Sequence, residues 1–207
     1  MTYATLGQVR GWLGIVDQAD DVELGLALAA AEAAIDAHCG YSFDIDASPA
    51  ARVFAAHRPD LLDVAAAGLP IGTSAALVIA TDDNADGVFE TTWASADYQL
   101  EPLNGRGQGG AVWPYTVVRA VGDRSFPVDA GGRALVQITA RFGWPAVPTR
   151  VRTASIMLTA AWHQRRATVT GRSGFDGFFS AAIEDDNAVR DLLEPLRHGA
   201  SLGYGLG

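Results

Sequence analysis

The segment from Phe142 to Arg166 constrains the fold of this chain more than any other part of its 207 residues. Its sequence, FGWPAVPTRVRTASIMLTAAWHQRR, predicts the end of a strand, a turn at two prolines and a long helix that Pro148 can begin without losing a hydrogen bond. Apolar residues follow one face of this helix at spacings of three and four: Val151, Ala154, Leu158, Ala161 and Trp162. Three more lie around the other side: Ile156, Met157 and Ala160. A helix that is apolar nearly all round has to be buried all round, so we expect the fold core to cover one side and another subunit the other.

The same helix suggests which residues face inward and which face a partner. We expect Leu158 and Trp162 in the core, and Ile156 and His163 nearer to an interface with another subunit. Basic residues occur only towards the two ends of the helix: Arg150, Arg152, Arg165 and Arg166. Arginine suits protein interfaces because its planar group donates several hydrogen bonds in a fixed geometry.

Two more helices are predicted before residue 44. Thr5 is a candidate N-cap for the first, and Gly14 would end it. The second would begin at Asp20 or Asp21 and end at Gly40. One stripe of the second helix is apolar: Leu24, Leu28, Ala31 and Ile35. Its many alanines make a smooth surface, which either packs in an ordinary core or permits close approach by a neighbour.

The middle of the chain, residues 50–142, is predicted to be rich in strands. Short β-branched or aromatic runs are separated by turn residues: ARVFAA, AALVIAT, GVFETTW, DYQLE, WPYTVVRAV and RALVQITARF. The pair Asp86-Gly87 is a hairpin signal between the second and third runs.

After the long helix, a terminal helix is predicted, with Asp185 or Asp186 as its cap. Its apolar residues are spaced i, i+3, i+4 and i+7: Val189, Leu192, Leu193 and Leu196. The sequence therefore predicts an α+β fold with about four helices. Residues 1–43 and 147–198 would form the helical core, residues 50–142 a β-rich insertion, and residues 199–207 a flexible Gly-rich tail.

Composition excludes several classes of protein. The net charge of −9 argues against a general nucleic-acid binder, which needs a basic face to neutralise phosphates. The single cysteine, Cys39, excludes an internal disulfide and a Cys-based zinc cluster, and is typical of a reducing compartment. The N-terminus lacks a signal-peptide pattern, and no apolar run approaches the ~18 residues that span a membrane. We therefore expect a soluble protein made in the cytoplasm.

One segment suggests a metal site. Oxygen-bearing side chains alternate as in the first half of a calcium loop, at Asp82, Asn84 and Asp86, and Glu90 stands at the ninth position. The twelfth position, where such a loop has a bidentate glutamate, is Trp93, and the flanks are strands. A polar hairpin turn is therefore favoured, and a weak calcium site is the alternative. No other pattern of histidines, carboxylates or nucleophiles predicts a cofactor or catalysis, so we do not expect an enzyme.

Three segments, in this order, resemble the phage head-to-tail adaptors, also called head-tail connector or head completion proteins. The first is YATLGQVRGWLGIVDQADDVELGLALAAAEAAIDAHCGYSF. The second runs from YQLEPLN through WPYTVVRAV to VQITARFGWPAVPTRVRTASIMLTAAWHQRR, and the third is VRDLLEPLRHG. Together they cover both ends of the chain, and a β-rich insertion lies between, as in long versions of the family.

This resemblance implies a structural virion protein of long-tailed phages, made in the bacterial host and placed at the head–tail interface. Such adaptors form a ring, usually of twelve subunits, on the portal protein of the DNA-filled capsid, and they extend the DNA channel. The implied partners are copies of itself, the portal, the next connector, stopper or tail protein, and genomic DNA that passes without specific binding; no membrane is involved. The implied interface residues are Arg150, Arg152, Ile156, His163, Arg165 and Arg166, with Tyr204 in a tail that inserts against a partner. The alternatives are a head-tail stopper or tail terminator ring protein, and a calcium-dependent binding module built on the Asp82 hairpin.

Overall fold

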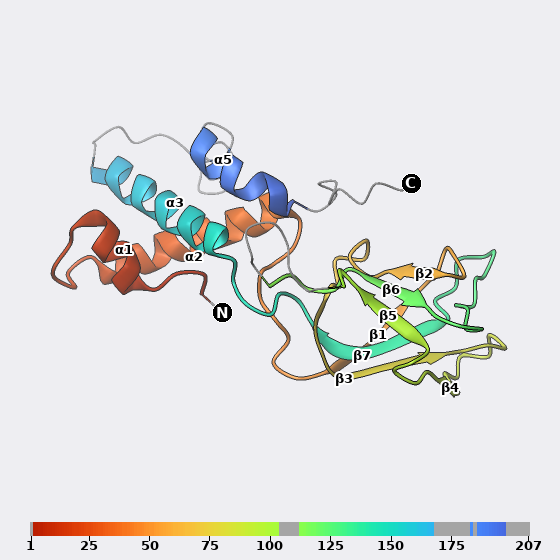
Figure 1. The fold of residues 1–207 in the computed structure, drawn as a ribbon. Helices are drawn as coiled ribbons and strands as arrows, with labels where there is room; N and C mark the ends of the chain where they lie inside the picture. The colour runs from red at the N-terminus through yellow and green to blue at the C-terminus, as the bar shows by residue number, and fades with distance from the viewer. Residues whose placement is uncertain (1, 104–111, 168–182, 184–185, 198–207) are drawn as a thin grey trace. The chain divides into compact units, whose positions relative to one another are not determined.

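The computed structural model describes residues 2–103, 112–167, 183 and 186–197, and these divide into two compact units (Figure 1). The helical unit comprises the described residues of 1–43 and 147–207, and the β unit comprises those of 44–146. The predicted α+β class is confirmed, because helices from both ends of the chain pack together and the middle forms antiparallel sheets. In the described residues, no helix combines the length and hydropathy needed to cross a membrane.

The helical unit contains α1 (Leu6–Leu13), α2 (Asp21–Cys39), α3 (Thr149–Ala167), α5 (Asn187–Leu193) and a 3-10 turn (Glu194–Leu196). Local sequence sets these ends as predicted. Thr5 and Gln8 form a capping box, in which the Thr5 Oγ1 accepts from the Gln8 N–H at 3.2 Å and the Gln8 side chain accepts from the Thr5 N–H at 2.9 Å. Gly14 and Gly40 end α1 and α2 in the left-handed conformation, with φ of 72° and 83°.

The structure decides between the alternative N-caps predicted for α2 and α5. Asp20 is the N-cap of α2, although its side chain makes no capping hydrogen bond. Asp186 is the N-cap of α5, and its carboxylate accepts from the N–H groups of Ala188 and Val189 at 2.9 and 3.2 Å.

Helix α3 is at the centre of the helical unit and packs against α1, α2 and α5. Its buried residues include the predicted Val151, Ala154 and Leu158, and Trp162 is half-buried. Part of the cover of α3 comes from its own helical unit, and the cover by another subunit stays a prediction. Ala160 is buried, and Ile156 and Met157 are half-buried, because helices of the same unit surround α3.

Hydrogen bonds from two tyrosines join the ends of the helical unit. The Tyr3 N–H donates to Glu32 at 2.5 Å, the Tyr3 hydroxyl donates to Asp36, and the same hydroxyl accepts from the Phe43 N–H at 2.9 Å. The Tyr41 hydroxyl donates to the carbonyl of Leu196, and burial raises the pKa of Tyr41. The N-terminal segment and the C-terminal turn are thereby both tied to the end of α2.

The β unit holds two antiparallel sheets, with strand orders β1-β7-β3-β4 and β2-β6-β5. The strands are β1 (Ala50–Phe54), β2 (Leu61–Asp63), β3 (Ile71–Thr81), β4 (Thr91–Thr92), β5 (Tyr98–Glu101), β6 (Val117–Ala120) and β7 (Val136–Phe142). Each of the six predicted runs contains one strand, and β2 was not predicted. Burial alternates strictly along β7, so Val136, Ile138, Ala140 and Phe142 point into the core. There Trp93 stacks on Phe126 with ring centroids 4.6 Å apart.

The two chain ends of the β unit are paired with each other. Ile45 bridges Gly143, the Asp46 N–H donates to the Phe142 carbonyl at 2.8 Å, and the Trp144 N–H donates to the Asp44 carbonyl at 2.9 Å. Gly143 has φ of 110°, and a Cβ added there would lie 1.8 Å from the Asp44 oxygen. Only glycine therefore permits this close approach of two backbones.

Candidate interaction surfaces

The first turn of α3 carries two arginines. Arg150 is exposed and Arg152 is half-buried, and neither forms an ion pair with a side chain in the described part of the chain. No acidic residue stands in this turn. A positive charge at a helix N-terminus opposes the helix dipole and costs about 0.3–1 kcal/mol. Helix stability therefore does not explain the two arginines, whereas a negative group outside this unit would offset their charge.

The other predicted interface residues on α3 divide into two groups. Ile156 packs against the cluster of Ala4, Val9, Leu24 and Leu28, and the His163 Nε2 lies 3.8 Å from the Asp20 carboxylate, so both contact their own helical unit. The side chains of Arg165 and Arg166 lie outside the described part of the structure, as do Tyr204 and the tail. The interface roles of all four residues of α3 and of Tyr204 stay predictions.

A surface for which the sequence left core packing and approach by a neighbour both open lies on α2. Val22 and Leu26 have 77% and 61% of their surface exposed, and Ala29, Ala33 and Ala37 are exposed on the same helix face. We call these five residues the α2 apolar face. Their spacing of four, three, four and four keeps them on one side of the helix, and none of them is charged. The detectable signal was that Val22 and Leu26 are out of phase with the buried stripe that begins at Leu24.

Two large side chains just before α2 are exposed as well. Trp12 at the end of α1 is 60% exposed, and Val16 in the connection to α2 is 97% exposed. Single exposed apolar residues are common on soluble proteins, but contiguous apolar surface marks interaction sites. Within the described part of the helical unit, the exposed large apolar side chains all lie in the first 40 residues: Trp12, Val16, Val22 and Leu26.

The Asp82 hairpin brings together three of the four predicted calcium ligands. Ligand atoms of Asp82, Asp86 and Glu90 lie within 4.8 Å of one another. Asp82 is buried, and its carboxylate oxygens accept from the N–H groups of Asp86 at 3.2 Å and Gly87 at 2.8 Å. The Asn84 side-chain oxygen accepts from the Asp86 N–H at 3.0 Å, and its amide nitrogen donates to the Asp86 carboxylate. These hydrogen bonds are those of a polar turn, and they account for the placement of Asp82, Asn84 and Asp86.

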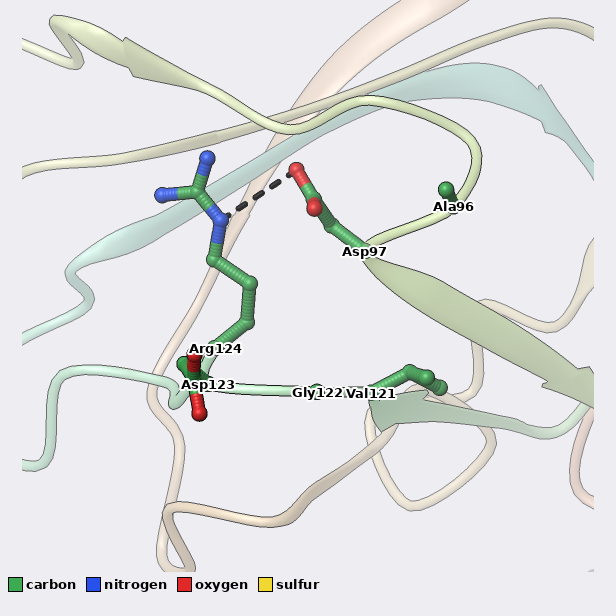
Figure 2. A pocket seen from close by; sticks show the side chains of 6 residues that line it. All are labelled: Ala96, Asp97, Val121, Gly122, Asp123 and Arg124. Carbon is green, nitrogen blue, oxygen red and sulfur yellow. Dashed lines mark ion pairs between the residues drawn. The ribbon is translucent and has the colours of Figure 1, made fainter.

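A shallow hollow in the β unit is lined by an ion pair and a further carboxylate (Figure 2). The Nε of Arg124 lies 3.2 Å from the Asp97 carboxylate, and its guanidinium lies 6.0 Å from the centroid of the Trp93 ring. The rest of the lining is Ala96, Val121, Gly122 and Asp123. The pairing of Arg124 explains the hollow as a structural feature between two turns.

The pKa values of Glu101 and Cys39 are shifted by structural contacts and burial. Arg119 binds Glu101 at 2.7 Å and holds the pKa of that carboxyl below its ordinary value. Burial raises the pKa of the Cys39 thiol to about 12, so this side chain is protonated and unreactive at neutral pH.

Two solved structures are similar to most of this chain. A chain in the neck of an empty gene transfer agent (GTA) particle, computed with C6 symmetry, has a TM-score of 0.48 and 22% identity, and the match covers 92% of this chain and 87% of that one. A chain in the neck of a native GTA particle, computed with C12 symmetry, has a TM-score of 0.44 and 25% identity, with coverage of 84% and 81%. No protein-family model and no curated protein matches the chain.

Proposed function

We propose that this chain is a head-to-tail adaptor, a structural virion protein that forms a ring between the portal of a DNA-filled capsid and the tail. One observation carries the proposal. The segments that resemble adaptors are far apart in sequence, yet α1 and α2 of the first, α3 of the second and α5 of the third belong to one helical unit. The residues between them fold as a separate β unit. A stopper or tail terminator, mainly a β barrel, would not need this helical unit.

Charge and exposure support a place in an assembly. The net charge of −9 suits a channel protein that must let DNA pass without binding it. The exposed α2 apolar face and the arginines in the first turn of α3 suit contacts with neighbouring proteins. The role proposed for the chain places it at the same kind of joint as the neck described for the two matched GTA chains.

The direct test is to mix the purified full chain with purified portal rings. Electron microscopy and native mass spectrometry should show a second ring stacked on the portal, and the mass gives the number of copies. Absence of a stacked ring over a range of salt concentrations, with portal rings that remain intact, would reject the adaptor function.

A second test addresses the predicted arginines. Changing Arg165 and Arg166 together to alanine should give heads that package DNA but join tails poorly, because these residues are proposed to contact a neighbour or the portal. The matched control is Arg52→Ala, which removes an exposed arginine of the β unit. Normal tail joining by the double variant would remove these two residues from the interface.

A further inference from the structure

We propose that the α2 apolar face docks a second copy of this chain, and that the docking group of that copy is the first turn of α3 with Arg150 and Arg152. The inference rests on the proposed function, in which copies of the chain form a ring. It adds which two surfaces of the helical unit meet.

The character of the α2 apolar face fits a neighbour of the same charge. Each copy carries a net charge of −9, so a contact between copies has to avoid placing carboxylates opposite each other. The α2 apolar face contains no charged residue. Its three alanines permit a close approach, and the exposed Val22 and Leu26 supply the larger apolar area.

The borders of this face are negative. Glu23 lies along one border of the helix face and Asp36 along the other, and both are half-buried. Each side chain has contacts in its own chain, and each carries a formal negative charge at the rim of the face. The first turn of α3 is the opposite in charge, because Arg150 and Arg152 have no described ion-pair partner and no acidic residue stands beside them in that turn. Electrostatic complementarity of this kind selects partners and sets their orientation.

The arginines cannot reach the Val22–Leu26 end of the α2 apolar face within one copy. The His163–Asp20 contact places the C-terminal half of α3 beside the start of α2, so the two helices run antiparallel (Figure 1). Fourteen residues separate Thr149 from His163, which is about 20 Å along a helix. The arginine-bearing turn is therefore at the opposite end of the helix pair from Val22 and Leu26, and reaching them requires another copy.

The arrangement of the two surfaces also fits a ring. Identical subunits in a ring of more than two meet head to tail, through two different surfaces of each subunit. This chain carries two such surfaces on separate helices. One is the α2 apolar face with carboxylates at its borders, and the other is the basic first turn of α3. A two-fold dimer would instead join one surface to itself.

Cysteine crosslinking tests which surfaces meet. One batch of the full chain carries Leu26→Cys and another carries Thr149→Cys, a change beside Arg150 that keeps both arginines. The native Cys39 can stay, because it is buried and its thiol does not ionise at neutral pH. The batches are mixed, assembled into rings with portal, and treated with a short bismaleimide. We expect a crosslinked dimer in the mixture and in neither batch alone, identified by mass spectrometry of the linked peptides.

Each outcome has a distinct meaning. Rings that form without a link between positions 26 and 149 would overturn this inference and leave the proposed function intact. A link within the Leu26→Cys batch alone would establish a self-facing contact and overturn the head-to-tail pairing. An equally strong link to Val128→Cys, an exposed position of the β unit, would show random collision and also overturn it. Absence of any ring with the wild-type chain would reject the inference and the proposed function together.

Charge reversal gives an independent readout. Changing Arg150 and Arg152 to glutamate should lower the yield of assembled rings at least tenfold, because glutamates would face the acidic border of α2. The control Arg52→Glu makes a change of the same kind in the β unit and should leave assembly at the wild-type level. Circular dichroism checks that both variants fold. Wild-type assembly by the folded double variant would count against the first turn of α3 as the docking group.

Discussion

Replacing Gly143 by alanine should destabilise the β unit by about 2–6 kcal/mol. The backbone at this position has φ of 110°, and holding a residue with a Cβ in such a conformation costs about 1–3 kcal/mol. The added Cβ would also lie 1.8 Å from the Asp44 oxygen, so the two backbones must separate. That movement disrupts the hydrogen bonds from Trp144 to Asp44 and from Asp46 to Phe142, at about 0.5–1.5 kcal/mol each.

Thermal and urea denaturation of the full chain, followed by Trp fluorescence and circular dichroism, measure this effect. Gly132→Ala is the matched control, because Gly132 also has positive φ, at 77°, but an added Cβ meets nothing within 4 Å. The control should lose only the conformational part, about 1–2 kcal/mol. Equal losses of unfolding free energy for the two variants would refute the argument from close backbone approach. Wild-type stability of Gly143→Ala would refute the close contact of Gly143 with Asp44.

Three further predictions concern stability and ion binding. Ser155→Ala should raise the free energy of unfolding by up to about 1 kcal/mol in urea denaturation, because the buried Ser155 hydroxyl has no hydrogen-bond partner in the described structure. Thr159→Ala is its control and should not stabilise, since the Thr159 hydroxyl donates to the Ser155 carbonyl at 2.7 Å. The Glu101–Arg119 pair should stabilise the chain above the ordinary Glu pKa of 4.5 and lose this contribution as pH falls through the lower folded-state pKa, so Glu101→Gln should flatten the acid limb of stability against pH. Calcium should leave the melting temperature unchanged, because the Asp82 oxygens already accept backbone N–H groups; a shift abolished by Asp86→Ala would establish the calcium site instead.

The helix ends could be predicted from sequence because they depend on local chemistry. Thr5, Gly14 and Gly40 act through their own side chain or their own φ, and each stands where the pattern placed it. The six predicted strand runs were likewise recognisable by β-branched residues between turns. Strand β2 was missed because three residues are too short for alternation to be detected.

Some features that depend on contacts far apart in sequence could not be predicted. The cover of α3 by α1 and α5 could not be predicted because periodicity shows how much surface is apolar, and not which helices cover it. The role of the α2 alanine surface was left open for the related reason that alanine occurs both in cores and on surfaces. The need for glycine at position 143 arises from a segment about one hundred residues earlier in the chain.

The paired ends of the β unit have a consequence for the folding of the helical unit. The two parts of the helical unit are separated by a loop of about 100 residues in an unfolded chain, and bringing the ends of such a loop together is entropically unfavourable. Once the β unit has folded, the contact between Ile45 and Gly143 shortens this loop to a few residues. The loop-closure relation puts the gain at about 3 kcal/mol. Folding of the β unit therefore lowers the entropic cost of docking α2 against α3, and by the same coupling the docked helices stabilise the paired ends of the β unit.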